Sequence, residues 1–174
     1  GSWNRLIINS QIRIVNDHAI EGYRIITGWA KLRKVYFYIE FSSPILSSSL
    51  RDGDRQYENT PVINGSNLHA MLRFGKLNEK PLICKVALSP ISTDNAQLNL
   101  KQEASHWDFN QYTTDADRLW EKELEKINIQ GTDLQKTIFY TALYHTLIQP
   151  NTISDVNGEY MAADYTTRQL SANE

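Results

Sequence analysis

LICKVALSPISTDNA, residues 82–96, is the stretch in which the chain changes from a strand pattern to a helix pattern. Its first part, Leu82–Leu88, has the apolar and β-branched residues that favour a strand. Ser92 or Thr93 can then cap the N-terminus of a helix that runs to about Ala104. The inner face of that helix is expected to carry Ala96, Leu100 and Ala104. The stretch therefore predicts a sheet before it and helices after it.

The residues before this stretch read as short strands. Gln11–Val15 alternates polar and apolar side chains, and Val35–Phe41 is rich in aromatic and β-branched residues. Residues 23–28 and Leu68–Phe74 are further strand-like runs, and Asn16-Asp17-His18 is a predicted turn. Short strands at this spacing indicate an antiparallel sheet or sandwich.

Residues 42–66 form a long polar stretch that we expect to be a loop. A loop of this length is either functional or mobile, or it is a solvated excursion. Asp52-Gly53-Asp54 is similar to half of a calcium loop, but the further acidic ligands and the final glutamate of an EF-hand are missing.

Two more helices follow residue 104. Asp108, with Gln111 three residues later, predicts the start of a second helix, and Thr132 with Gln135 predicts a capping box at the start of a third. Pro150 is expected to end the third helix. The third helix has a wide apolar face that we expect to associate with a second copy of the chain. That face carries Ile138, Phe139, Leu143 and Leu147.

Composition excludes several classes of protein. Among 174 residues, 41% are hydrophobic and 22% are charged, which is typical of a folded chain. The net charge of -2 gives no basic field for nucleic acid, and no apolar run approaches the ~20 residues of a membrane span. The single cysteine, Cys84, cannot form an internal disulfide, and one cysteine does not supply the thiolates usual in a zinc site. We expect Cys84 to be buried in a strand.

The charge is divided unevenly along the chain. Residues 1–90 hold 12 basic and 7 acidic residues, whereas residues 91–174 hold 6 basic and 13 acidic residues. The change coincides with the change from strands to helices. It indicates a change of architecture at about residue 90.

The segment after Pro150 is the most suggestive stretch for chemistry. Complete catalytic motifs are not visible, and the four histidines are not spaced like metal ligands. The segment brings carboxylates, amides and tyrosines close together in sequence, an arrangement that can frame a sugar or metal site. Alternatively, residues 156–159 form an ordinary β-turn with Asn-Gly chemistry. The polar and aromatic residues of the segment are Asp155, Asn157, Glu159, Tyr160, Asp164 and Tyr165.

The end of the third helix and this segment together resemble a known family. FYTALYHTLIQPN (residues 139–151) followed by SDVNGEY (residues 154–160) resembles a segment of family 92 glycoside hydrolases, which are exo-acting bacterial alpha-mannosidases. The resemblance covers nearly all of residues 20–162. Further matching stretches are residues 22–24, 28–30, 35–37, 86–96, 107–109, 120–124 and 135–137.

The resemblance implies an α+β fold, in which a portion of an antiparallel β-sandwich is followed by helices that form a linker and the start of an (α/α)6 barrel. Residues 1–2 are interpreted as a tag remnant, 3–91 as a partial β-sandwich, 92–131 as a helical linker and 132–174 as the start of the catalytic domain. The chain is then a piece of a longer protein, expected to be periplasmic or secreted, although no signal peptide is present in this sequence.

The resemblance also implies a function for the longer protein. Members of the family are calcium-dependent, inverting alpha-mannosidases that hydrolyse mannose-containing glycans with a carboxylic acid and a carboxylate base. Those groups, and the calcium cofactor, are expected beyond residue 174, so we predict no catalytic residue and no metal ligand in this chain and an inactive fragment. Asp155, Tyr160 and Asp164 are the residues expected near substrate. After Tyr160 the family commonly reads Arg-Gly-x-Asp, whereas this chain reads Met161-Ala162-Ala163-Asp164.

Two other functions remain open at this point. One is a non-catalytic carbohydrate-binding sandwich that uses Trp3, Trp29 or Tyr57 as an aromatic platform for sugars. The other is a structural interaction module without a ligand.

Overall fold

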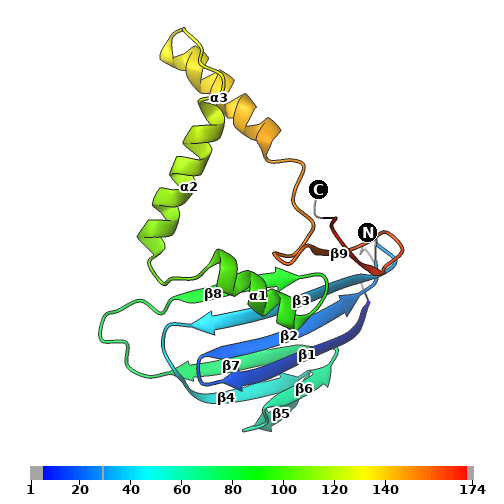
Figure 1. Ribbon diagram of the computed structural model, residues 1–174. Coiled ribbons are helices and arrows are strands. Elements are labelled where there is room, and N and C mark those ends of the chain that lie inside the picture. Colours follow the sequence, from blue (N-terminus) through cyan, green and yellow to red (C-terminus); the bar gives the residue numbers. More distant parts are fainter. Residues whose placement is uncertain (1–5, 29, 172–174) are drawn as a thin grey trace. The chain divides into compact units, whose positions relative to one another are not determined.

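The computed structural model describes residues 6–28 and 30–171 (Figure 1). Antiparallel sheets are followed by helices, which confirms the α+β fold predicted from the sequence. The elements are β1 (Ile7–Asn16), β2 (Ala19–Ile26), β3 (Arg33–Phe41), β4 (Ile45–Asp52), β5 (Arg55–Glu58), β6 (Val62–Gly65), β7 (Leu68–Phe74), β8 (Cys84–Ser89), α1 (Thr93–Glu103), α2 (Phe109–Leu124), α3 (Asp133–Leu147), β9 (Glu159–Met161) and β10 (Thr167–Gln169).

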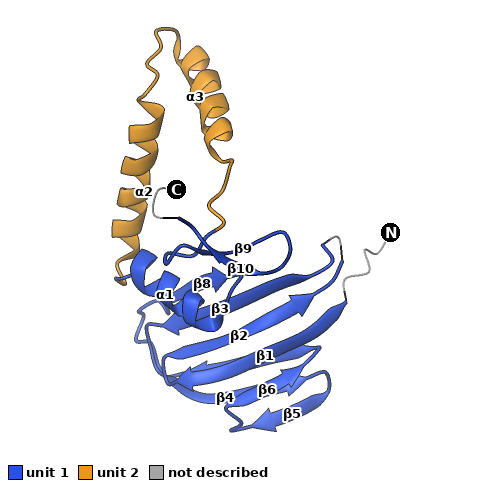
Figure 2. Cartoon of the chain, turned by 45° about the vertical axis from the view of Figure 1, so that its right-hand side comes forward, with its two compact units in different colours: residues 1–105, 154–174 blue, residues 106–153 orange. Residues whose placement is uncertain are grey.

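The chain divides into two compact units (Figure 2). The first unit contains the sheets, α1 and the segment from residue 154 onward, and the second contains residues 106–153. The C-terminal segment thus returns to the unit in which the chain begins.

Two antiparallel sheets form the body of the first unit. The larger has five strands in the order β6-β1-β2-β3-β8, and the smaller has three in the order β5-β4-β7. The turn between β1 and β2 is the predicted one, and the amide of His18 donates to Asn16 Oδ1 over 2.7 Å. The ring centroids of Phe41 and Phe74 lie 5.1 Å apart and join the two sheets.

The polar stretch at residues 42–66 is not a loop, so that prediction was wrong. It contains β4, β5 and β6, and β4 pairs on both sides, with β5 and with β7. Ser47, Ser48 and Ser49 lie within β4, where backbone pairing stabilises the strand, while Leu50 is fully buried. Gly53, with φ +57°, sits in the hairpin turn that follows.

Helix α1 covers part of the larger sheet and contacts β8, β3 and β2 (Figure 1). Its predicted N-cap is correct, because the amide of Asn95 donates to Ser92 Oγ over 3.0 Å. Ala96 and Leu100 pack with Tyr38 of β3 in a buried cluster, as the predicted inner face requires. Burial raises the pKa of the Tyr38 hydroxyl.

Strand β8 lies at the edge of the larger sheet, and its outer face is open. Val86 and Leu88 are each 58% exposed. Cys84, which the strand pattern predicted to be buried, is also exposed. Side chains alternate between the two faces along β8, so Cys84, Val86 and Leu88 lie on the face opposite Ala87, which packs against the α1 cluster, and this explains the difference.

The second unit consists of α2 and α3. Both predicted helix starts are correct: Asp108 accepts a hydrogen bond from the amide of Gln111, and Thr132 forms a full capping box with Gln135. The rings of Trp120 and Tyr144 lie 4.6 Å apart, centroid to centroid. The described side chains of α2 and α3 include none that is fully buried.

We predict that this 174-residue chain self-associates through the apolar face of α3. Ile138 is 61% exposed and Leu147 is 40% exposed, while Phe139 and Leu143 are partly covered. Ile138→Asp should shift the protein from dimer to monomer in light scattering. Lys136→Asp, on the same helix, is the control. A wild-type chain that stays monomeric at high concentration would contradict this expectation.

Candidate functional site

The carboxylate of Asp155 is buried and accepts three hydrogen bonds from side chains of the first unit. Ser89 Oγ, at the end of β8, donates over 2.6 Å. Asn95 Nδ2 and Asn99 Nδ2, on successive turns of α1, donate over 2.8 Å and 2.7 Å. Asp155 therefore joins the C-terminal segment to both the sheet and the helix.

The hydrogen bonds of these partners extend the network. Ser89 Oγ accepts from the amides of Ile91 and Ser92, at the entry to α1, over 2.9 Å and 3.3 Å. Asn99 Oδ1 accepts from the amide of Val156 over 3.0 Å, while its Nδ2 also donates to the carbonyl of Leu88. In the described residues, every buried side-chain polar atom has a partner.

Residues 154–160 form a tight hairpin above this network. The amide of Asp155 donates to the carbonyl of Glu159, and the amide of Gly158 donates to the carbonyl of Asp155, each over 2.8 Å. Gly158 has φ +83°, a conformation that glycine adopts without strain. The β-turn that Asn157-Gly158 predicted is therefore present.

Glu159 is a second carboxylate beside Asp155. Its Oε2 accepts from Asn95 Nδ2 over 2.8 Å and from Asn157 Nδ2 over 2.9 Å. These hydrogen bonds, chiefly that from Asn95, lower the pKa of the Glu159 carboxyl. Asn95 thus bridges the two carboxylates with one amide group.

Asp164 stabilises a second turn, between β9 and β10. Its carboxylate accepts from the hydroxyl of Thr166 over 2.6 Å, from the amide of Thr166 over 3.1 Å and from Arg168 over 2.7 Å. The Thr166 hydroxyl, followed by the Thr166 amide and Arg168, lowers the pKa of Asp164 from 3.8 to about 2.

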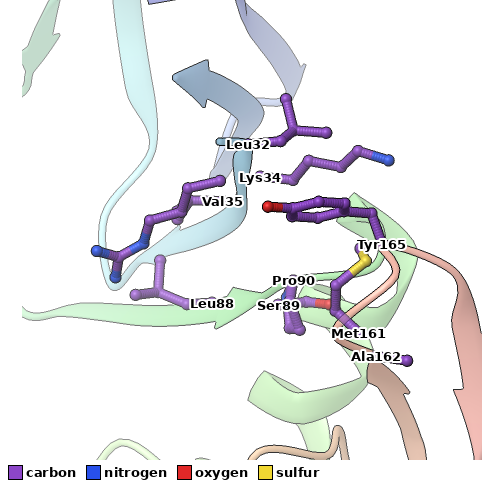
Figure 3. A pocket seen from close by; sticks show the side chains of 10 residues that line it. Leu32, Lys34, Val35, Leu88, Ser89, Pro90, Met161, Ala162 and Tyr165 are labelled. Carbon is purple, nitrogen blue, oxygen red and sulfur yellow. The ribbon is translucent and has the colours of Figure 1, made fainter. Parts of the chain in front are cut away.

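A cavity of about 340 Å³ lies beside the β9–β10 hairpin, within the first unit (Figure 3). The start of β3, the end of β8 and the β9–β10 hairpin contribute its walls. Most of the wall is aliphatic, with Tyr165 as its aromatic member. The lining residues are Leu32, Arg33, Lys34, Val35, Leu88, Ser89, Pro90, Met161, Ala162 and Tyr165.

The three residues expected near substrate lie in different surroundings. Asp155 lies in the buried network, Tyr160 lies in β9 opposite Arg168 of β10, and Asp164 lies in the turn. Tyr160 and Asp164 are not among the residues that line the cavity, whereas Tyr165 is. A role of these residues toward substrate stays a prediction.

Sequence reasoning missed the partners of Asp155. Asn95 and Asn99 are four apart, next to the predicted inner positions Ala96 and Leu100. Two amides at helical spacing beside an apolar stripe are a signal of a buried polar partner. The sequence could not identify that partner, because Asp155 lies 56 residues beyond Asn99.

The structure offers little for the other ligands considered. In the described residues, no three carboxylate, histidine or cysteine side chains come together closely enough to hold a metal. Nor does any helix in the described residues have the length and apolar character needed to cross a membrane.

The aromatic residues of the alternative sugar platform are only partly described. Tyr57 lies in β5, half-buried, with the guanidinium of Arg55 5.0 Å from its ring centroid. Trp3 and Trp29 lie outside the described residues.

Comparison with known proteins assigns the chain to a family. Residues 2–89 match the model of the glycosyl hydrolase family 92 N-terminal domain, and residues 95–173 match that of the family 92 catalytic domain. The chain therefore belongs to glycosyl hydrolase family 92, which confirms the resemblance drawn from its sequence. The network around Asp155 joins residues from both matched segments.

Solved structures agree with this assignment. A family GH92 alpha-mannosidase from Bacteroides thetaiotaomicron is 29% identical, with a TM-score of 0.86, over 94% of this chain and 23% of that one. A GH92 inverting mannosidase from the same species shares the fold, with a TM-score of 0.79 and 24% identity over 92% of this chain and 23% of that one. The chain thus spans about a quarter of their length.

A curated relative agrees as well. An uncharacterized secreted glycosidase from Arthroderma benhamiae is 34% identical over 80 residues, which are 43% of this chain and 10% of that protein.

We predict that the turn at Asp164 loses order between about pH 4 and pH 2. The folded pKa, about 2, lies below the ordinary value of 3.8. Protonation therefore opposes the folded turn, whose stabilisation is complete above pH 4 and is lost as the pH falls through 2. The amide resonance of Thr166 should titrate with a midpoint near 2.

Thr166→Val is the matched variant, because it removes the hydroxyl that lowers the pKa most. It should move the midpoint toward 3.8. A wild-type midpoint already near 3.8 would contradict the assigned hydrogen bonds.

Proposed function

We propose that the longer protein to which this chain belongs is an exo-acting alpha-mannosidase that hydrolyses mannose-containing glycans. The observation that carries the proposal is the fit of this chain to a GH92 alpha-mannosidase over 94% of its residues, with a TM-score of 0.86. The match of both family domains to consecutive parts of the chain supports it further.

Within that enzyme, the proposed role of this chain is structural. Its hydrogen bonds fasten the C-terminal segment, through Asp155, to Ser89 at the end of β8 and to α1. Because catalytic carboxylates must be held at a fixed separation, an inverting enzyme depends on rigid attachment of the elements that frame its site. The chain by itself is proposed to be inactive, with the acid and base supplied by residues beyond residue 174.

Three finer properties belong to the same proposal: inversion at the anomeric carbon, dependence on calcium and a secreted or periplasmic location. One of the two Bacteroides thetaiotaomicron relatives is an inverting mannosidase, and the Arthroderma benhamiae relative is named a secreted glycosidase. Calcium dependence rests on the family resemblance alone.

Hydrolysis of an α-linked mannobiose by the longer protein tests the proposal. We expect release of mannose as the β-anomer, seen by proton NMR in the first minutes, and loss of activity in a calcium chelator that added calcium restores. The 174-residue chain, run in parallel, should release none.

Three results would count against parts of this account. Cleavage of α-glucosides but not α-mannosides by the longer protein would overturn the substrate. Release of the α-anomer would overturn inversion. Hydrolysis by the 174-residue chain would overturn its proposed lack of catalytic groups.

A further inference from the structure

The two turns of the C-terminal segment have the same hydrogen-bond pattern but different residues at the left-handed position. In the first turn Asp155 N donates to Glu159 O and Gly158 N to Asp155 O. In the second, Ala162 N donates to Thr166 O and Tyr165 N to Ala162 O, each over 2.9 Å. The equivalent residues are therefore Gly158 and Tyr165.

Tyr165 adopts an unfavourable backbone conformation at this position. Its φ is +65°, a region that bulky residues rarely adopt because the Cβ crowds the backbone. Glycine fills the equivalent position of the neighbouring turn without that cost, so the turn itself does not require tyrosine. Such strain persists where the surroundings enforce it, and it concentrates at ligand sites.

The Tyr165 side chain faces the cavity beside the hairpin. Its ring extends from the turn toward Leu32 and Val35 (Figure 3), and 38% of the residue stays exposed. The turn that holds it is fixed by the three hydrogen bonds to Asp164. The strained residue thus presents an aromatic surface from a rigid support.

The other walls of the cavity complement this ring. Leu32, Val35 and Met161 supply aliphatic surface, and the cationic side chains of Arg33 and Lys34, neither with an ion-pair partner in the described residues, are hydrogen-bond donors of the same wall. The volume of 340 Å³ lies at the low end of the range of roughly 300–1,000 Å³ for small-ligand sites. A ligand of one sugar ring suits that size.

We propose that this cavity binds a hexopyranoside, with the C–H face of the sugar on the Tyr165 ring and its hydroxyls toward Lys34. An aromatic ring suits the apolar face of a pyranose, and the ammonium suits its oxygens. The choice of an α-mannoside as the hexopyranoside rests on the proposed function. The site is a binding site only, since no carboxylate lines it.

The test is a titration of the 174-residue chain with methyl α-D-mannopyranoside, followed by NMR of the Tyr165 amide and ring. We expect saturable shifts in the millimolar range. Tyr165→Gly should weaken binding by about three- to tenfold, the loss of one aromatic contact, without lowering the melting temperature. Tyr165→Phe keeps the ring and should bind within about twofold of wild type.

Four results would overturn the proposal. The first two are no saturable binding by the wild-type chain and unchanged binding by Tyr165→Gly. The third is a lowered melting temperature of Tyr165→Gly, which would make the ring a packing residue. The fourth is loss of binding on Tyr57→Ala, which would move the site to β5.

The failure of this proposal is separable from that of the proposed function. Mannoside hydrolysis by the longer protein, with no binding by the chain, would remove the cavity site alone. Binding of methyl α-D-glucopyranoside in preference to the mannoside, with no mannoside hydrolysis by the longer protein, would keep a sugar site at Tyr165 and overturn the substrate class.

Discussion

Three side-chain donors converge on the buried carboxylate of Asp155, and the position of the whole C-terminal segment depends on them. An ionised carboxylate leaves water only at a large cost, which a full set of hydrogen bonds offsets. Ser89 and Asn99 supply bonds from the sheet and from the helix, so the carboxylate is satisfied only where both meet. This requirement selects one place for the segment.

The fixed position of the β9–β10 hairpin makes the neighbouring cavity possible. Met161 and Tyr165 reach the start of β3 only because the hairpin is fastened at Asp155 and stiffened at Asp164. A backbone as unfavourable as that of Tyr165 needs surroundings that over-determine it. The buried hydrogen-bond network and the strained tyrosine therefore belong together: the network around Asp155 supplies the rigidity that holds Tyr165 in its unfavourable conformation.

Patterns among residues close in sequence predicted much of this fold, whereas contacts between residues distant in sequence were missed. The caps at Ser92 and Thr132 were readable because a cap and its partner lie within three residues. The strands in residues 42–66 were missed because their stability comes from pairing with distant strands rather than from their own polar side chains. The carboxylate of Asp155 was noticed as a candidate, but its partners Asn95 and Asn99 depend on tertiary contacts that spacing does not reveal.

Hydrogen exchange of the hairpin amides tests the central role of Asp155 most directly. In the wild-type chain the amides of Val156 and Gly158 should be protected, since each has a hydrogen-bond acceptor. Asp155→Ala leaves buried donors unpaired, at a cost of about 3 kcal/mol, so these amides should exchange about 100-fold faster. Asp164→Ala, in the other turn, should leave them protected. Equal protection of Val156 and Gly158 in the two variants would contradict the account.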